Sequence, residues 1–251
     1  MKALTHSAIA TKQRLKIEWI VASDLEKEED DTNAEARKIA LETLKKCHGI
    51  VVPGGFGTRG FEGKIAAIKY ARESKTPFLG ICLGMQASVI EYCRNVLGRT
   101  EAHSSEFKEG LVEDVEDAVI FMPEGDRERM GGTMRLGLRE TILQEGSIAH
   151  RVYGQDVVHE RHRHRYEVNP ALVPDLDAAG LRFVGRNTDG SGERMEVVEL
   201  DENVHPYFVG AQFHPEFTSR PEKPNPLFLG LLQASKAAAN AEKLTKIAGA
   251  E

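Results

Sequence analysis

The sequence has few of the features that would indicate a secreted, membrane-spanning or disulfide-bonded protein. Its 3 cysteines among 251 residues stand at scattered positions, which excludes a disulfide framework and favours a reducing compartment. No apolar run approaches the ~20 residues of a membrane span, and the N-terminus lacks the apolar segment of a signal peptide. We therefore expect a cytoplasmic protein that does not enter a membrane.

A large excess of one charge is also lacking. The formal net charge is -6, from 33 lysines and arginines against 39 aspartates and glutamates, so the balance does not favour nucleic acid as a partner. No GxxxxGK[ST] sequence occurs, which leaves nucleotide chemistry within this chain unsupported. What is present is an ordinary composition, with 41% hydrophobic residues, that can bury a substantial core.

Apolar strands alternate with amphipathic helices through the first half of the chain. We predict strands over 15–22, 49–53 and 77–84, and helices near the N-terminus, ending near Gly49, and over 62–74 and 85–96. This alternation predicts an open, mostly parallel sheet, doubly wound with helices on both faces, in the flavodoxin-like manner.

The second half is richer in strands. We predict extended segments over 118–122, 133–140, 156–168, 181–187, 194–201 and 207–216, a loop over 123–132 and a closing helix over 225–244. The predicted fold class is therefore α/β with extra antiparallel strands in the C-terminal half. We expect one domain over 1–236, with the first strand of such a sheet missing, and a helix end and frayed tail over 237–251.

The sharpest local signal is Gly-Ile-Cys-Leu-Gly, centred on Cys82, between an apolar strand and a helix. Flanking glycines permit a tight elbow that lifts the side chain to the top of a sheet. The helix N-terminus then points at the sulfur and favours the thiolate. A lone cysteine in a strand is usually a buried core residue, as we expect for Cys47 and Cys93, but this setting predicts a nucleophile.

A thiolate nucleophile needs a base and a group that orients the base. The sequence Gln-Phe-His-Pro-Glu supplies both, in His214 and Glu216, at the end of an apolar strand. Residues two apart in an extended chain face the same side, so we expect these two side chains to project together. A histidine at a strand end is more often a surface group, and the pairing with Cys82 is what favours catalysis.

A glycine-rich loop, Pro-Gly-Gly-Phe-Gly, ends another strand at the edge where open α/β sheets place ligands. We expect the backbone N–H groups of Gly55 and Leu83 to form an oxyanion hole. Gly55, Gly57 and Gly60 also spell GxGxxG, so a dinucleotide site is a competing interpretation, weakened because the pattern follows a Pro-Gly break and lacks the later acidic residue.

The chain resembles the class I, triad-type glutamine amidotransferases, because it contains the motifs of that family in the same order: PGGFG, GICLGMQ and QFHPE. The longer stretches GGFGTRGFEGK, SSEF, GGTMRLG, ERHRHRYEVN and QFHPEFTSRP are similar to the C-terminal glutaminase domain of the CTP synthase family. The likeness runs from about Ala3 to the closing helix. Two other amidotransferase families, GMP synthetase and carbamoyl-phosphate synthetase, are less favoured as the match because of the stretches GGTMRLG and ERHRHRYE.

The resemblance implies hydrolysis of L-glutamine to glutamate through a thioester on Cys82, with His214 and Glu216 completing the triad and no cofactor. Charge pairing agrees, because Glu106 can pair with the α-ammonium group of glutamine and Arg165 with its α-carboxylate. The implied glutamine-binding residues are Gly54, Gly55, Phe56, Leu83, Gly84, Met85, Gln86, Glu106 and Arg165.

The resemblance also implies a partner, an N-terminal synthetase domain that uses ATP and Mg²⁺ to convert UTP to CTP with the released ammonia. Nothing in this sequence matches that domain. The family is activated by GTP, for which Arg59, Arg161 and Arg163 are candidates at the domain interface, and the full-length enzyme is expected to be a homo-oligomer.

His159, His162 and His164 invite a metal interpretation, but we predict no metal site because neighbouring arginines would repel a cation. Alternation instead places His162 and His164 on one face of a strand and the arginines on the other. Two further functions stay open: a cysteine hydrolase or peptidase with the same triad, and a non-catalytic module that binds a nucleotide.

Overall fold

The computed structural model describes residues 1–27, 32–107, 117–122, 134–188 and 192–248. The expected loop over 123–132 and the last residues of the expected tail lie outside these ranges. The elements, with η for short 3-10 helices, are α1 (Lys2–Ala10), η1 (Ala22–Leu25), α2 (Ala34–Lys45), β1 (Ile50–Val52), α3 (Phe61–Ser74), β2 (Phe78–Ile81), α4 (Leu83–Asn95), β3 (His103–Ser104), η2 (Ser105–Phe107), β4 (Asp117–Phe121), β5 (Arg135–Leu143), α5 (Ile148–Tyr153), β6 (Val157–His164), β7 (Tyr166–Val168), η3 (Pro170–Leu172), α6 (Val173–Ala178), β8 (Leu181–Asn187), β9 (Arg194–Leu200), β10 (Phe208–Ala211), η4 (Pro215–Phe217) and α7 (Pro226–Ala248).

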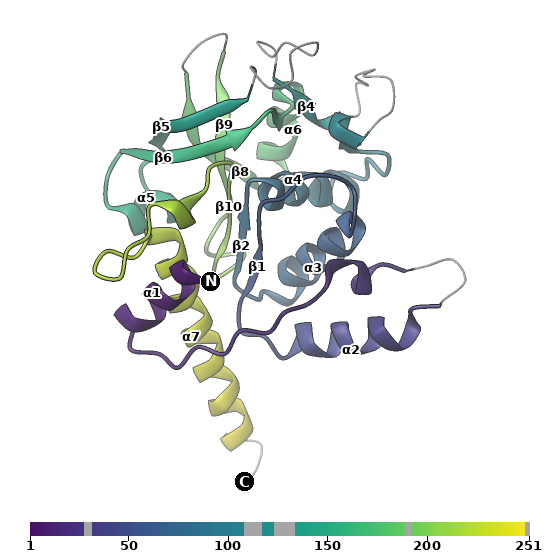
Figure 1. The fold of residues 1–251 in the computed structure, drawn as a ribbon, viewed down its shortest axis with the longest axis vertical. Coiled ribbons are helices and arrows are strands. Elements are labelled where there is room, and N and C mark those ends of the chain that lie inside the picture. Colours follow the sequence, from purple (N-terminus) through teal and green to yellow (C-terminus); the bar gives the residue numbers. More distant parts are fainter. Residues whose placement is uncertain (28–31, 108–116, 123–133, 189–191, 249–251) are drawn as a thin grey trace.

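A seven-stranded sheet in the order β1-β2-β10-β9-β8-β5-β6 organises the fold (Figure 1). β1, β2 and β10 are parallel, and the pairings from β10 to β6 are antiparallel. The expected α/β class, with antiparallel strands added by the C-terminal half, is confirmed. The parallel strands end together at one edge, where sheets of this type place ligands.

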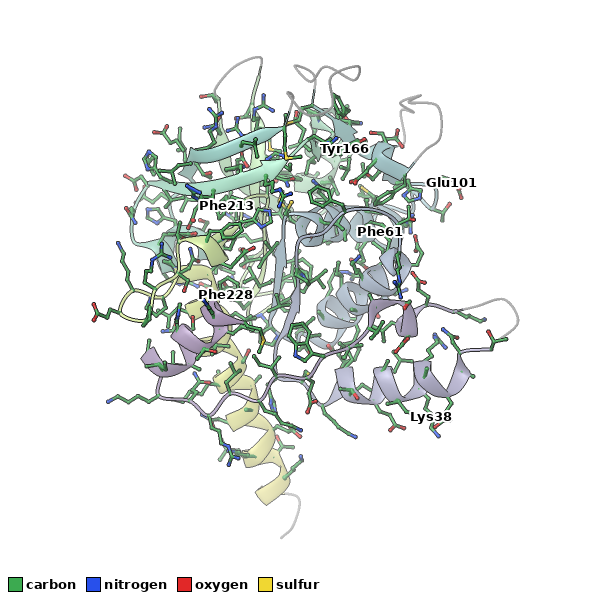
Figure 2. All side chains as sticks on the ribbon, viewed as in Figure 1. Lys38, Phe61, Glu101, Tyr166, Phe213 and Phe228 are labelled. Atoms are coloured by element: carbon green, nitrogen blue, oxygen red, sulfur yellow. The ribbon has the colours of Figure 1, made fainter. Side chains whose placement is uncertain are left out.

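Helices cover both faces of the parallel strands, because successive residues of a buried strand point to opposite sides. In β2, Phe78 packs into the core on the α3 and α4 side, whereas Leu79 packs into the core on the α1 and α7 side. Phe61 of α3 and Phe228 of α7 belong to these two cores and lie on opposite sides of the sheet (Figure 2).

The strand expected over 156–168 is in fact two strands in different sheets. β6 pairs with β5 in the large sheet, whereas β7 pairs with β4 in a three-stranded sheet of order β3-β4-β7. The break falls at Arg165, whose carbonyl accepts a hydrogen bond from Met122 at 3.0 Å. The sequence does not indicate this break, since apolar and polar residues alternate with the same period through both strands.

The strand expected over 15–22 is also wrong. Residues 15–21 lie between α1 and η1, Ala22 begins η1, and none of them belongs to either sheet of the described chain. Alternation of apolar and polar residues favours an extended backbone, but a strand also needs a hydrogen-bonded neighbour. Trp19 in this segment is 75% exposed.

Candidate active site

Cys82 occupies the turn between β2 and α4. Its backbone has φ 51° and ψ -104°, a positive-φ conformation that residues other than glycine rarely adopt. The flanking glycines allow the turn to pack tightly. A methyl group on Gly80 would lie 2.7 Å from the carbonyl oxygen of Gly84, and one on Gly84 would lie 2.0 Å from that of Val52. The predicted nucleophile elbow is therefore present in the backbone.

His214 and Glu216 lie beside this elbow. Nδ1 of His214 is 2.8 Å from Oε1 of Glu216, and the imidazole lies close enough to Cys82 for the sulfur to raise the pKa of His214. The local structure differs from the expected extended chain, because β10 ends at Ala211 and Glu216 lies in the 3-10 helix η4. Pro215, at the start of η4, favours this turn, which brings the carboxylate back toward the imidazole.

Two backbone hydrogen bonds, one within the sequence QFHPE and one at the residue before it, fix the position of His214. The amide of His214 donates to the carbonyl of Arg161 in β6 at 2.8 Å, and the amide of Cys82 donates to the carbonyl of Ala211 at 2.7 Å.

A buried carboxylate of β6 also holds this part of the chain in place. Glu160 accepts hydrogen bonds from Tyr153 at 2.7 Å, Thr218 at 2.7 Å and Asn225 at 2.6 Å. This network attaches the turn after η4 to β6 and α7.

The electrostatics of His214 favour its charged form. Burial alone lowers the pKa of this histidine, but hydrogen bonds to Cys82 and Glu216, together with their negative charges, outweigh burial and raise the pKa to about 9. An imidazolium between a sulfur and a carboxylate is the charge arrangement that a thiolate nucleophile requires.

The glycine-rich loop after β1 lies over the sulfur. A methyl group on Gly54 would lie 2.9 Å from Cε1 of His214 and 3.3 Å from Cβ of Cys82. Gly55 follows at the surface of the same loop, and Leu83 begins α4, whose first N–H groups have no partner within the helix. A methyl group on Gly55 would lie 3.5 Å from Cδ2 of Leu83, so the segments that hold the two predicted oxyanion donors are in contact beside Cys82.

Glu106 and Arg165 carry opposite charges near this loop. The amide of Gly57 lies 3.4 Å from Oε1 of Glu106. Burial raises the pKa of Glu106, and this amide and the positive charge of Arg165 partly offset that effect. Both side chains are half-buried, Glu106 in η2 and Arg165 between β6 and β7. Their charges match the ammonium and carboxylate groups of a free amino acid.

The other predicted arginines are exposed. Arg163 lies with its guanidinium 5.7 Å from the ring centroid of Phe56, a cation–π contact that joins β6 to the glycine-rich loop. Arg161 and Arg163 point outward, as the alternating burial of β6 requires, and Arg59 is exposed in the loop before α3. Their predicted role in binding GTP stays a prediction.

At the start of α4, Leu83, Gly84, Met85 and Gln86 are all buried. The side chain of Gln86 donates to the carbonyl of Tyr166 at 3.0 Å and to Oε1 of Gln212 at 3.1 Å. Direct contacts between these residues and glutamine therefore stay predictions. Sequence reasoning missed Gln212, although it stands two residues before His214, a spacing that could have indicated it.

His162, His164 and Glu196 meet in the interior, with one ligand atom of each within 4.8 Å of the others. His164 Nδ1 must donate to the carbonyl of Tyr166 at 3.0 Å, so its Nε2 accepts from Nδ1 of His162 at 3.1 Å. Arg135 lies 3.5 Å from Glu196 and supplies a positive charge. A metal would have to compete with these contacts, and the predicted absence of a metal stays a prediction.

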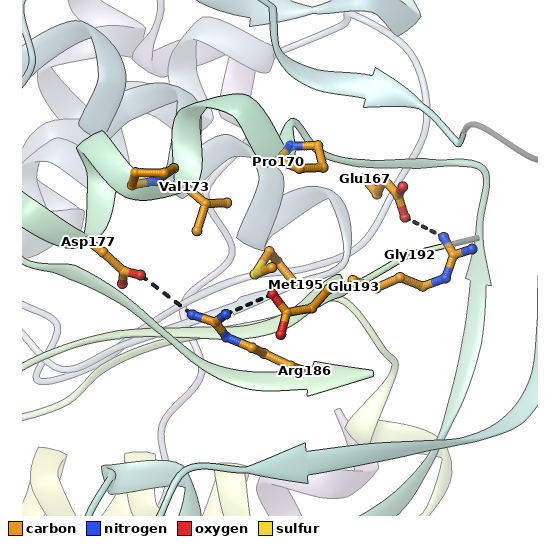
Figure 3. Close-up of a pocket in the computed structure, with 10 residues that line it drawn as sticks. Glu167, Pro170, Val173, Asp177, Arg186, Gly192, Glu193 and Met195 are labelled. Atoms are coloured by element: carbon orange, nitrogen blue, oxygen red, sulfur yellow. Dashed lines mark hydrogen bonds and ion pairs between the residues drawn. The ribbon is translucent and has the colours of Figure 1, made fainter. Parts of the chain in front are cut away.

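A separate pocket of about 580 Å³ opens between α6 and the ends of β8 and β9 (Figure 3). Arg186 in this pocket pairs with Asp177 at 3.5 Å and Glu193 at 2.8 Å, and Arg194 pairs with Glu167 at 2.6 Å. Burial and the charge of Glu196 raise the pKa of Glu167 to about 7. The described residues that line this pocket are Glu167, Pro170, Val173, Pro174, Asp177, Arg186, Gly192, Glu193, Arg194 and Met195.

Comparison with known proteins agrees with this geometry. The sequence matches the model of the family "Glutamine amidotransferase class-I" over residues 2–234. It is 54% identical to CTP synthase 1-A of Xenopus laevis and 50% identical to CTP synthase 1 of Homo sapiens, in each case over 237 residues that cover 94% of this chain and 39% of the relative. The chain therefore spans about two fifths of the length of these relatives.

Among solved structures, the chain is similar to the glutaminase domain of Trypanosoma brucei CTPS with bound acivicin. The TM-score is 0.83 and the identity 38%, over 94% of this chain and 86% of that chain. The chain belongs to the class I glutamine amidotransferase family. Within that family it is similar to the glutaminase domains of CTP synthases, which confirms the resemblance seen in the sequence.

In the part of the chain that the structure describes, none of the helices combines the length and apolar character needed to cross a bilayer.

Proposed function

We propose that this chain hydrolyses L-glutamine to glutamate and ammonia, with Cys82 as nucleophile, His214 as acid and base, and Glu216 as the group that orients His214. The observation that carries the proposal is the position of one imidazole, which lies 2.8 Å from the carboxylate of Glu216 and packs with Cys82 against the same face of Gly54. The positive φ of Cys82 supports it, because strained backbone concentrates at functional sites.

In the first half of the reaction, the Cys82 thiolate attacks the side-chain amide carbon of glutamine, and the carbonyl oxygen becomes an oxyanion. The N–H groups of Gly55 and Leu83 stabilise that charge. His214, as imidazolium, gives its proton to the departing nitrogen, so ammonia leaves and a glutamyl thioester remains.

In the second half, neutral His214 takes a proton from water while the water oxygen attacks the thioester carbon. The carbon–sulfur bond breaks, glutamate leaves, and the thiolate and imidazolium are restored. Glu106 holds the α-ammonium group and Arg165 the α-carboxylate throughout, which selects a free amino acid over a peptide. Gly54, Phe56, Gly84, Met85 and Gln86 complete the glutamine site.

The relatives are more than twice as long as this chain. We propose that a separate N-terminal synthetase domain uses ATP and Mg²⁺ to convert UTP to CTP, with GTP as activator near Arg59, Arg161 and Arg163. Such an enzyme would be a cytoplasmic homo-oligomer, and the glutaminase step itself needs no cofactor.

The test is to incubate the chain with glutamine and to measure glutamate and ammonia, which should appear in equal amounts. Cys82→Ala should abolish turnover while the circular dichroism spectrum is retained, because the nucleophile is lost and the fold is not. An unchanged rate in this variant would rule out the mechanism. Peptide and ester substrates serve as controls, since their cleavage would instead favour a cysteine hydrolase.

A further inference from the structure

The side chain of Gln212 contacts the sulfur of Cys82. Its Nε2 lies 3.6 Å from Sγ, a hydrogen-bond distance for a sulfur acceptor. Both residues are buried, Gln212 with 1% and Cys82 with 4% of its surface exposed. The register that pairs Ala211 with Ile81 in adjacent parallel strands brings the next residue of each strand, Gln212 and Cys82, side by side. This contact thus follows from the sheet itself.

The orientation of the Gln212 amide is fixed by the backbone carbonyl of Tyr166, through the side chain of Gln86 that lies between them. Nε2 of Gln86 lies 3.0 Å from the carbonyl oxygen of Tyr166, and because a carbonyl only accepts, the NH₂ group of Gln86 must face it. The second N–H of that group points to Gln212 at 3.1 Å, which requires an oxygen there. The NH₂ group of Gln212 is therefore the end that faces Cys82.

The main chain of Gln212 is held as firmly as its side chain. Its amide donates to the carbonyl of Glu196 in β9 at 2.8 Å, and the carbonyl of the preceding Ala211 accepts from the amide of Cys82 at 2.7 Å. Sheet hydrogen bonds on both sides thus fix the point from which the side chain extends. A donor placed this rigidly needs no reorganisation when charge develops on the sulfur.

We propose that Gln212 is a further catalytic residue, which donates an amide N–H to the Cys82 thiolate, and that Gln86 is a positioning residue, which keeps that amide in its donating orientation. The proposal rests on the proposed role of Cys82 as nucleophile. Hydrogen bonds to an anion are stronger than those to a neutral group, so the contact strengthens as the thiol becomes a thiolate.

This donor acts twice in the reaction. It stabilises the thiolate that attacks glutamine, and it stabilises the thiolate that leaves when water cleaves the thioester. The sulfur is then held between two donors, the imidazolium of His214 and the amide of Gln212. Gln86 uses both of its N–H groups within the protein, so its contribution to catalysis passes through Gln212.

The test measures the alkylation rate of Cys82 by iodoacetamide across a range of pH, following the Cys82 peptide by mass spectrometry so that Cys47 and Cys93 do not interfere. Gln212→Met removes the donor. It should raise the midpoint of the pH profile by about one unit and slow alkylation about tenfold at pH values well below the wild-type midpoint. At high pH, where the thiolate forms without help, the limiting rate should be unchanged or higher.

Two more variants make the result independent of any single substitution. Gln212→Glu keeps the shape of the side chain, loses the donor and adds negative charge, so its midpoint should rise at least as far, and it replaces Gln212→Met if that variant does not fold. Gln86→Met should move the midpoint in the same direction by a smaller amount. Because His214 also faces the sulfur, each profile is compared with the wild type under identical conditions.

The matched control is Ser88→Ala, which removes a buried polar group of α4 whose hydroxyl donates to the carbonyl of Met85 at 2.6 Å. Its midpoint should equal that of the wild type. Folded Gln212 variants with an unmoved midpoint would overturn the proposal, as would a rate that falls equally at every pH, which indicates a purely structural role. Alkylation needs no glutamine, so a wild-type chain without glutaminase activity would contradict the proposed function and leave this test readable.

Discussion

Gly54 packs directly against the imidazole of His214, so that a methyl group added to the glycine would lie 2.9 Å from Cε1 of the histidine. Residues from two distant parts of the chain thereby meet above Cys82. A carbon–carbon contact this short is strongly repulsive, so the imidazole must move if Gly54 gains a side chain. The position of the base thus depends on the absence of a side chain in the glycine-rich loop.

Gly54→Ala should therefore lower kcat for glutamine hydrolysis by a factor of about ten or more, because a shift of the base costs at least about 1.4 kcal/mol in the transition state. Stability should change little, since Gly54 lies in the loop after β1, which ends at Val52. Gly192→Ala, where no atom lies within 4 Å of the added methyl group, is the control. Equal kcat values for the two variants would contradict this account of Gly54.

The pH dependence of turnover should reflect His214. Burial lowers the pKa of this histidine, but the hydrogen bonds and charges of Cys82 and Glu216 raise it to about 9. In the proposed mechanism the imidazolium protonates the departing nitrogen, so kcat/KM should fall as the pH rises above about 9 and that proton is lost.

Glu216→Gln removes one of the charges that stabilise the imidazolium, so this falling limb should move to lower pH. Measurement of kcat/KM between about pH 6 and pH 10.5 checks the expectation. Glu222→Gln, which removes an exposed carboxylate, is the matched control for loss of one negative charge. A falling limb at the same pH in all three proteins would show that Glu216 does not act on His214.

Arg165→Ala should mainly weaken glutamine binding. Loss of a planar guanidinium partner for the α-carboxylate costs about 2 kcal/mol, which corresponds to a rise in KM of about thirtyfold. The value of kcat should change much less, because Arg165 does not touch the reacting carbon. Arg151→Ala breaks an exposed ion pair with Glu202 and serves as the control. A large fall in kcat at unchanged KM would contradict the assigned role.

Protein stability should fall in mild acid because of the buried histidines. Burial, with nearby positive charges, lowers the pKa of His162 to about 2 and that of His164 to about 3. In the unfolded chain each would take up a proton below about pH 6.5. Between pH 6.5 and these folded-state values the unfolded state binds more protons, so the free energy of unfolding decreases as the pH falls.

His164→Asn keeps a donor for the carbonyl of Tyr166 but removes one titrating group. In urea unfolding at several pH values between about 4 and 6, its free energy of unfolding should lose about 1.4 kcal/mol less per pH unit than that of the wild type. The comparison uses the difference between the proteins because Glu167, whose pKa burial raises to about 7, has the opposite effect in both. Identical slopes would show that His164 is not buried neutral.

Some of the site could be predicted from sequence because its determinants are local. The glycines on either side of Cys82 are required by backbone contacts at Gly80 and Gly84, and such contacts follow from a strand that turns at once into a helix. The strand before Cys82 and the helix after it follow from apolar periodicity. The sequence also predicts His214 and Glu216 as the partners of Cys82, since the residue types that activate a thiolate are few.

Other features depended on which segments became neighbours. Alternation indicated an extended backbone at 15–22, but only a hydrogen-bonded neighbour makes a strand, and the described chain supplies none there. The same alternation continued through Arg165, although β6 and β7 pair with different partners on either side of it. Periodicity reports the conformation of one segment and carries no information on its pairing.

By itself, then, the sequence determined the class of fold and the elbow at Cys82, because both follow from local patterns, and it predicted the residue types of the proposed triad. Only the tertiary structure decided that Gln212 faces the sulfur and that Gln86 fixes its amide. Those contacts join β2, α4, β7 and β10, and hydrogen-bond orientation among such distant groups is set by packing in three dimensions.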